Sequence, residues 1–191
     1  MFLKKELLQN NVKESEYLMK SNNETMNKDE ITVLNILEQH AKESAEKIAE
    51  RCDLSNQKVR RIIKRLDEKK IIWGYSAITD KNRKDMKHFT LLTTRSNELL
   101  DASFSKEIVI EKLDSYLPGL VQIENIYMTH GRYSGIVTFY APDLLTAKKL
   151  VQEINKRIGK YFKEYLLLET LFPIRKQGFK NPRIKELVGY I

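Results

Sequence analysis

The chain has 191 residues, a single cysteine, three histidines and a formal net charge of +8. That length allows one large or two small domains, each able to bury a core without a disulfide or a metal. The lone Cys52 excludes an internal disulfide, and the scattered histidines disfavour a zinc site, which needs clustered ligands. We therefore expect no metal, no cofactor and a cytoplasmic location. The lack of an apolar run of about 18 residues predicts no membrane span.

Charge is distributed unevenly along the chain. Residues 29–53 contain three basic and seven acidic residues, whereas residues 58–70 contain seven basic and two acidic residues. A focused positive segment beside an acidic one suits contact with phosphates, because the acidic remainder discourages indiscriminate adhesion. The total charge alone is compatible with binding to nucleic acid, with binding to an anionic membrane surface, or with solubility only. The uneven distribution of charge is therefore the more informative observation.

Three short helices are expected from residue 28 to about the Arg65-Leu66 pair. Apolar residues at helical spacing predict the first helix over Lys28–His40 and the second, capped by Ser44, over residues 45–52. Ser55 is the expected N-cap of the third helix, which has an apolar stripe formed by Val59, Ile62, Ile63 and Leu66. The last two helices form a helix-turn-helix, an arrangement that lays its second helix in the major groove of DNA.

The outer face of the third helix carries the candidate DNA contacts. Cations there suit phosphates or guanine edges, and amides suit adenine or backbone oxygens. The candidate residues are Ser55, Asn56, Gln57, Lys58, Arg60, Arg61 and Lys64, with Lys81, Arg83 and Lys84 as further phosphate contacts. A solvated surface helix is the alternative interpretation, because Lys and Arg favour helices and runs of charge are usually exposed.

The hydrophobic pattern changes its period after this helix. Residues 71–80 alternate and predict a short strand, with Gly74 permitting a bend. Beyond a linker, the expected order is strand, helix, strand, strand, helix and strand, at residues 88–95, 105–117, 121–129, 134–141, 142–158 and 164–172. This is the ferredoxin-like order, in which two helices cover one face of a four-stranded antiparallel sheet. A second copy would bury the other face, so we expect a homodimer.

The predicted fold class is therefore α+β. The first 27 residues read as a polar arm with a helix over residues 3–19 that has too few apolar anchors for a core. The predicted segments are the arm at 1–27, a winged-helix-like helix-turn-helix domain at 28–79, a linker at 80–87, a βαββαβ dimerisation and effector domain at 88–176, and a tail at 177–191.

Several motifs follow one another in a specific order. In the first domain they are "IAERC", a Leu-Ser pair that opens an Arg-rich helix ending in Arg-Leu, and an I-x-G-Y strand. In the second domain they are the element order and "GLVQIENIYMTHGRYSGIVTFYA". Over about residues 26–175 the chain resembles the Lrp/AsnC family of feast/famine transcriptional regulators. The resemblance implies a homodimer that binds double-stranded DNA and assembles further, up to an octamer.

The turn between the two middle strands is where the resemblance implies a small-molecule effector site. Family members that sense amino acids have a Gly followed three positions later by an Asp, whose carboxylate holds the ammonium group. Here Gly131 is followed by Arg132, Tyr133 and Ser134, and a hydroxyl cannot neutralise an ammonium. We expect an atypical site at Gly131, Tyr133 and Ser134, with a different effector or none.

Two other functions fit the sequence. The sirohaem decarboxylases resemble the same family in both domains, but a His-rich hairpin with Asn and Trp is expected of them, and this hairpin offers only His130. The chain has no Gly-rich phosphate loop, no metal-spaced carboxylates and no nucleophile with an obvious base, so we expect that it is not an enzyme. The other function is architectural DNA coating, because residues 81–191 also carry a net charge of +7.

Overall fold

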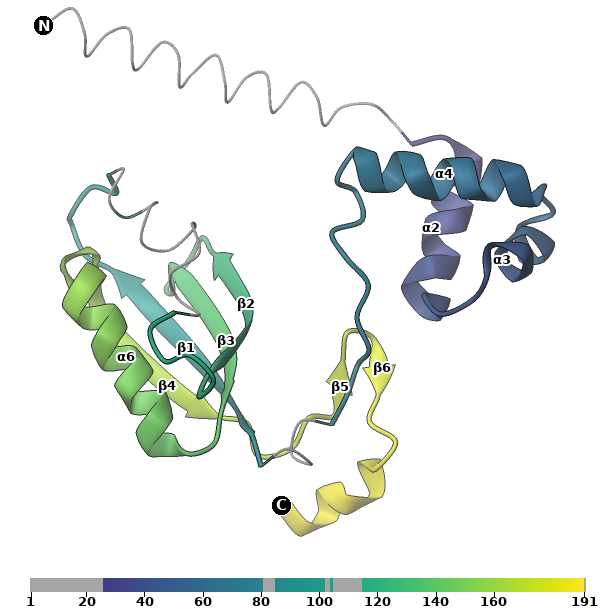
Figure 1. The fold of residues 1–191 in the computed structure, drawn as a ribbon. Helices are drawn as coiled ribbons and strands as arrows, with labels where there is room; N and C mark the ends of the chain where they lie inside the picture. The colour runs from purple at the N-terminus through teal and green to yellow at the C-terminus, as the bar shows by residue number, and fades with distance from the viewer. Residues whose placement is uncertain (1–25, 81–84, 102–103, 105–114, 191) are drawn as a thin grey trace, which may run out of the picture. The chain divides into compact units, whose positions relative to one another are not determined.

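The structure is a computed structural model that describes residues 26–80, 85–101, 104 and 115–190. The chain divides between Ala77 and Ile78 into two compact units, one helical and one built on a β-sheet (Figure 1). The expected arm helix and most of the expected helix at 105–117 lie outside the described residues. No helix in the described ranges is both long enough and apolar enough to cross a bilayer.

The first unit contains the three predicted helices: α2 (Lys28–His40), α3 (Ala45–Cys52) and α4 (Asn56–Glu68). The last of them runs two residues beyond the expected Arg65-Leu66 end. Each begins at an N-cap whose side chain accepts a hydrogen bond from a backbone N–H one turn ahead; the caps are Asn27, Ser44 and Ser55. Asp53 adopts a left-handed conformation with φ of 53° and ends α3. The helices enclose a core of Val33, Leu37, Ile48, Ala49, Val59, Ile62 and Leu66.

A buried carboxylate ties α2 to α4. Glu30 is 2 % exposed, and its Oε2 accepts a hydrogen bond from the Asn27 backbone N–H at 2.9 Å. The Asn27 side chain accepts in return from the Glu30 N–H at 3.0 Å, which completes a capping box. The other oxygen, Oε1, lies 2.9 Å from Nε of Arg65 in α4. Glu30 therefore caps one helix and neutralises a cation of another.

Replacing Glu30 with Ala is expected to lower the free energy of unfolding by about 2–3 kcal/mol, because the capping box is broken and Arg65 loses its buried partner. Urea unfolding of the purified protein measures the change. Glu38→Ala is the matched control, since Glu38 is an exposed residue of the same helix. Equal losses for the two variants would show that the Glu30 contacts add no stability.

The segment after α4 does not form the predicted strand. Residues 71–80 have no regular secondary structure, and they pair with no strand among the described residues. The prediction was wrong because alternation alone does not make a strand. Backbone N–H and C=O groups need a ladder partner, and the described part of the first unit offers only helices. As a result, Trp73 is 95 % exposed, and Tyr75 is also exposed.

The second unit contains a four-stranded antiparallel sheet in the order β2-β3-β1-β4, with α6 (Leu144–Ile158) across one face (Figure 1). Its strands are β1 (Lys87–Arg95), β2 (Gln122–Met128), β3 (Gly135–Ala141) and β4 (Phe162–Glu169). The two central strands pair from Lys87 with Ala141 to Thr93 with Gly135. This topology confirms the predicted α+β class and the ferredoxin-like strand order.

Alternating side chains give the sheet two different faces. One face packs on α6 and forms a core that includes Phe89, Leu91, Val137, Phe139, Ala147, Leu150, Ile154 and Ile158. The register places the other set together on the opposite side: His88, Thr90, Leu92, Ile136, Thr138, Tyr140, Leu166 and Leu168. We call this second set the open face. Leu166 and Leu168 are 42 % and 45 % exposed there, so an apolar strip reaches the surface.

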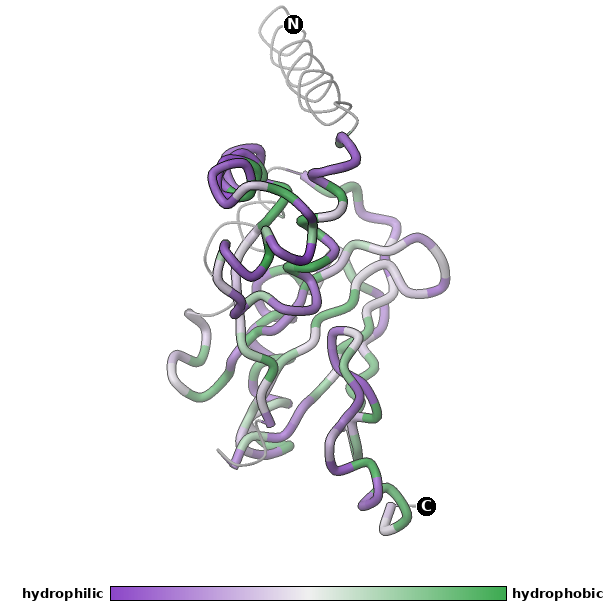
Figure 2. Tube along the Cα trace, turned by 90° about the vertical axis from the view of Figure 1, so that its right-hand side faces the viewer, coloured by the Kyte–Doolittle hydropathy of each residue, from purple (hydrophilic) through white to green (hydrophobic). Residues whose placement is uncertain are grey.

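A tail with secondary structure of its own follows β4, and its hairpin begins at Arg175, two residues before the tail predicted at 177–191. β5 (Arg175–Lys176) and β6 (Phe179–Lys180) form a hairpin across Gln177 and Gly178, which have positive φ of 48° and 83°. Two such residues in sequence suit a two-residue hairpin turn. The 3-10 helix η3 (Ile184–Tyr190) then brings the Tyr190 ring to 5.3 Å from the Phe172 ring. Figure 2 shows polar and apolar residues mixed along this tail.

Candidate nucleic-acid interface

Seven of the predicted DNA contacts occupy the first part of α4 and its cap, and the linker candidates Lys81, Arg83 and Lys84 lie outside the described residues. Asn56, Arg60 and Lys64 are spaced four residues apart and form one row along the helix, while Gln57 and Arg61 form the adjacent row. Asn56 is partly buried, and the other six candidates are exposed. Because the opposite face of α4 lies in the core, the helix presents a polar, cationic surface outward.

The cap residue has a structural task. Ser55 Oγ accepts a hydrogen bond from the Lys58 backbone N–H at 3.3 Å, so this hydroxyl is used by the helix itself. The positive end of the helix dipole lies at the same end of α4, where it favours an approaching phosphate. Ser55 therefore fixes the start of the candidate interface, and the contacts with a ligand fall to the residues that follow it.

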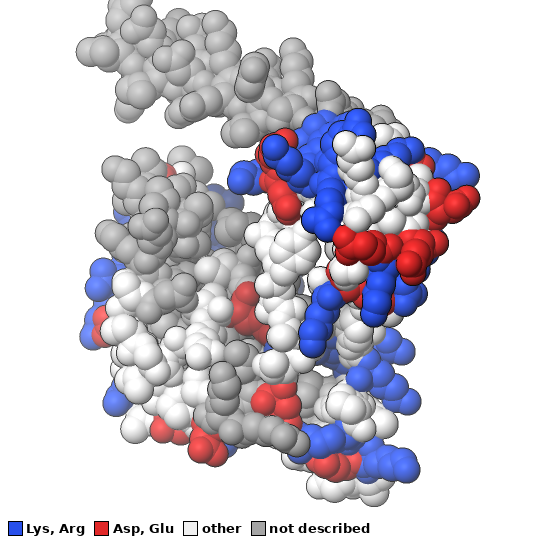
Figure 3. All heavy atoms as spheres, turned by 45° about the vertical axis from the view of Figure 1, so that its right-hand side comes forward, with Lys and Arg blue, Asp and Glu red and all other residues white. Residues whose placement is uncertain are grey.

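Most cations of α4 are paired with carboxylates. Lys58 Nζ lies 2.5 Å from Asp29 Oδ2, and Lys64 Nζ lies 3.7 Å from Glu68 Oε1. Exposed pairs of this kind contribute at most about 1 kcal/mol each, so phosphates can replace the carboxylates. Arg61 makes no ion pair with any residue that the structure describes. Figure 3 shows the resulting surface, with Asp and Glu bordering Lys and Arg over the helical unit.

Three side chains form a closed network between α3 and α4, which we call the Glu46 network: Glu46, Asn56 and Arg60. Oε1 of Glu46 accepts from Nδ2 of Asn56 at 2.7 Å and from Nη2 of Arg60 at 2.6 Å. Oδ1 of Asn56 accepts from Nε of Arg60 at 2.9 Å. Sequence reasoning missed Glu46, because its two partners lie in another helix and no local pattern links them.

Hydrogen bonds lower the pKa of Glu46 to about 2. The largest contribution comes from its own backbone N–H, and the next come from the side chains of Arg60 and Asn56. The ordinary value is 4.5, so these hydrogen bonds together stabilise the fold fully above about pH 4.5, and that effect is lost as pH falls towards 2. An NMR titration should therefore find the Glu46 carboxyl titrating near 2, and nearer 4.5 in Arg60→Ala. A value near 4.5 in the unchanged protein would exclude a persistent network.

The predicted effector residues lie in the turn between β2 and β3. Gly131 has φ of 141°, which side chains disfavour. Both the backbone N–H and the hydroxyl of Ser134 donate to the Thr93 carbonyl, at 2.8 and 3.3 Å. The guanidinium of Arg132 lies 5.6 Å from the centre of the Tyr133 ring. The turn thus uses Ser134 to fix its own backbone, and it presents a cation, which suits an anionic group better than an ammonium.

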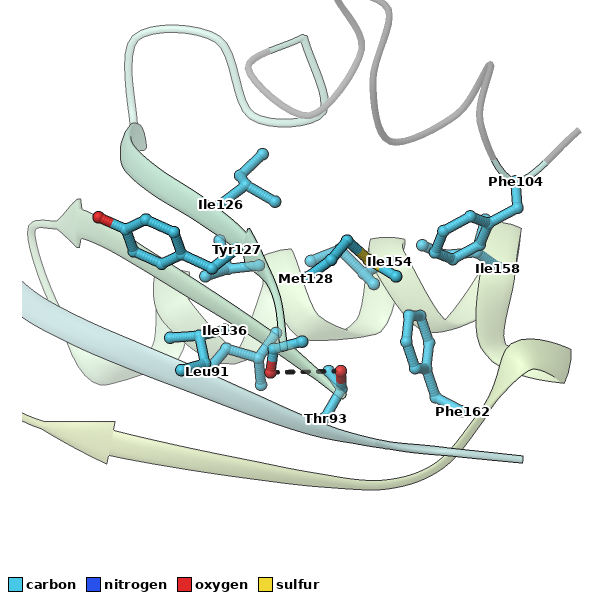
Figure 4. A pocket seen from close by; sticks show the side chains of 12 residues that line it. Leu91, Thr93, Phe104, Ile126, Tyr127, Met128, Ile136, Ile154, Ile158 and Phe162 are labelled. Atoms are coloured by element: carbon cyan, nitrogen blue, oxygen red, sulfur yellow. Dashed lines mark hydrogen bonds between the residues drawn. The ribbon is translucent and has the colours of Figure 1, made fainter. Parts of the chain in front are cut away.

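A cavity of about 30 Å³ lies between the sheet and α6 (Figure 4). Its walls are mostly apolar and include Ile126, Met128 and Ile154. The hydroxyl of Thr93 donates to the Gly135 carbonyl at 3.5 Å. None of the described residues that line it is charged. In the same described ranges, no three His, Cys, Asp or Glu side chains gather as metal ligands.

Comparison with known proteins agrees with this geometry. Residues 26–72 match the family described as winged helix-turn-helix DNA-binding. Most of the described part of the first unit is thus similar to winged helix-turn-helix DNA-binding domains, although the strand expected after α4 is not formed. No curated protein matches the chain in sequence.

The fold of the chain is similar to that of solved Lrp-type and AsnC-type structures. B. subtilis LrpC matches at 16 % identity with a TM-score of 0.58, covering 79 % of this chain and 98 % of that chain. The Mycobacterium tuberculosis leucine response regulatory protein matches at 16 % identity with a TM-score of 0.62, covering 80 % of this chain and 97 % of that chain. An AsnC family transcriptional regulator from Agrobacterium tumefaciens matches at 16 % identity with a TM-score of 0.60, covering 79 % of this chain and 94 % of that chain. At these identities the likeness establishes the fold, which confirms the resemblance predicted from the sequence.

Proposed function

We propose that the protein is a sequence-specific transcriptional regulator that binds double-stranded DNA as a homodimer. The observation that carries this proposal is the exposed cationic row of α4, the second helix of a helix-turn-helix in a DNA-binding domain. Such a helix enters the major groove with its N-terminal residues on base edges. α4 is accordingly the proposed recognition helix, and Gln57, Lys58, Arg60, Arg61 and Lys64 are its proposed contacts.

The open face of the sheet supports the homodimer. Leu166 and Leu168 lie next to each other on one side of β4, and both are more than two-fifths exposed. Exposed apolar strips on a sheet are a common place for a second copy to bind. A two-fold pair would carry two copies of α4, which is the arrangement that reads half-sites about one helical turn apart.

The hairpin turn with Gly131, Tyr133 and Ser134 is the proposed place for an effector. The cation of Arg132 and the Tyr133 ring favour a small molecule with an anionic or planar group. The ammonium of an amino acid would meet no carboxylate in this turn, since residues 129–134 contain no acidic residue. This assignment concerns regulation, and the proposed DNA binding does not depend on it.

Selection of binding sites from a random duplex pool at about physiological salt tests the proposed function. We expect enrichment of a roughly palindromic site. Retention of bulk DNA without enrichment would favour an architectural protein, for which affinity falls with salt equally for all sequences. No retention at all, or haem-like absorbance of the purified protein, would overturn the proposal in favour of an enzyme.

A further inference from the structure

We propose that Arg60 reads a guanine and that Glu46 and Asn56 are positioning residues that hold its guanidinium in the reading orientation. The inference rests on the proposed DNA-binding function and deepens it by naming one base and the residue that recognises it. The Glu46 network carries it, because that network leaves one edge of the guanidinium free and uses the other.

A guanidinium has two edges that can make paired hydrogen bonds. One edge is formed by Nε and Nη2, and the other by Nη1 and Nη2. In Arg60 the first edge is engaged, because Nε donates to Asn56 Oδ1 at 2.9 Å and Nη2 donates to Glu46 Oε1 at 2.6 Å. Nη1 and the second N–H of Nη2 make up the remaining edge, and the side chain is 64 % exposed. That edge matches the O6 and N7 acceptors of guanine.

Both ends of the Asn56 amide take part in the same network. Reading adenine takes both ends of an amide, its oxygen and its nitrogen. Here Oδ1 accepts from Arg60, and Nδ2 donates to Glu46 at 2.7 Å. The partners fix which end is which, because Nε of arginine only donates and a carboxylate only accepts. Both ends of the amide are thus held by side chains of the same network, so we assign Asn56 a positioning role instead of the base contact expected from the sequence.

Glu46 is a carboxylate on the surface that we expect to face DNA, where it repels the phosphates. A second effect of Glu46 must offset this repulsion if the residue is to favour recognition. An arginine side chain has several rotatable bonds, and ordering it on binding has an entropic cost. Two hydrogen bonds from α3 and α4 restrain the guanidinium before DNA arrives. The repulsion from Glu46 weakens binding to every sequence, whereas the restraint strengthens binding only where a guanine faces Arg60. Their combined effect is selectivity.

The test uses the full-length protein and a duplex enriched from the random pool. Dissociation constants are measured at fixed salt for that duplex and for versions with each guanine replaced by adenine. For the unchanged protein we expect one guanine per half-site with a preference of roughly ten- to hundredfold. Arg60→Ala should abolish that preference. Glu46→Gln should reduce it to about threefold or less while binding of unselected duplexes tightens.

Two further variants test whether the guanine preference depends on the position of the Glu46 carboxylate or only on its negative charge. Glu50→Gln removes the same charge from an exposed position one turn further along α3, and it should leave the guanine preference unchanged. Glu46→Asp keeps the charge but shortens the side chain by one methylene, and it should lower the preference. Thermal unfolding of each variant verifies that the domain still folds.

Each result has a distinct meaning. Tighter binding by Glu46→Gln with the guanine preference intact would overturn the positioning role and leave Glu46 as a simple competitor for Arg60. A guanine preference that survives Arg60→Ala would overturn the base assignment while the regulator function stands. If the unchanged protein enriches no site, the proposed function itself fails, and that outcome is seen before any variant is made.

Discussion

Replacing Arg60 and Arg61 together with Ala is expected to weaken binding to the enriched duplex by about 1–3 kcal/mol for each arginine. Both residues project from the exposed side of α4, away from the core that Val59 and Ile62 enter. The two losses differ in kind. Arg61 makes no ion pair with the described residues, so its loss removes a cation available to phosphates. The loss of Arg60 removes the proposed contact with guanine.

Fluorescence anisotropy over a range of salt concentrations distinguishes these contributions. Arg61→Ala alone should weaken binding to all sequences alike and make the salt slope shallower by about one. The control is Lys148→Ala with Lys149→Ala, which removes two charges from exposed positions of α6 in the other unit. If this control weakens binding as much as the arginine pair does, total charge governs affinity and α4 is not the recognition helix.

The first unit shows what local sequence can predict. The bounds of α2 and α3 and the start of α4 agree with the prediction because caps such as Ser44 and Ser55 and the apolar spacing act within one or two turns. The candidate residues of α4 also lie where predicted, because a helix with one buried face leaves the other face outside. Agreement is therefore best where the determining contacts are close in sequence.

Long-range contacts account for what the sequence did not predict. The alternating segment at residues 71–80 lacks a partner strand, and nothing within the segment reveals this. Glu46 meets Asn56 and Arg60 across ten and fourteen positions. From the sequence alone, Asn56 looks like a base contact. Its neighbours in space show that both ends of its amide are engaged, and the chemistry of the site depends on that.

The second unit combines both situations. Its strand order follows from the alternation of elements, since the ferredoxin-like plan is the familiar solution for that order. β4 nevertheless begins at Phe162, two residues before the predicted start, because pairing with Arg95 across a register shift extends it. The tail hairpin, with Lys176 on Glu124 of β2 at 2.7 Å, depends on a contact that no periodicity in the tail indicates.

The largest expected effect on assembly comes from the open face. Changing Leu166 and Leu168 together to Glu should convert the proposed dimer into monomers, because each copy would bring two carboxylates into an apolar interface. We expect the dimer dissociation constant, measured by sedimentation, to rise at least about a hundredfold, since burying unpaired charges costs several kcal/mol. Both side chains are partly exposed in the single chain, so the fold should tolerate the change.

Binding to DNA should then change in a characteristic way. Affinity for the full palindrome should fall, because two linked copies of α4 bind far more tightly than two independent ones, while affinity for a single half-site should stay the same. Leu144→Glu with Leu145→Glu is the matched control, since these leucines are exposed on α6 rather than on the open face. A dimer that survives in the Leu166 and Leu168 variant would place the two-fold contact elsewhere on the chain, and the spacing of the half-sites would then have to be explained from that other surface.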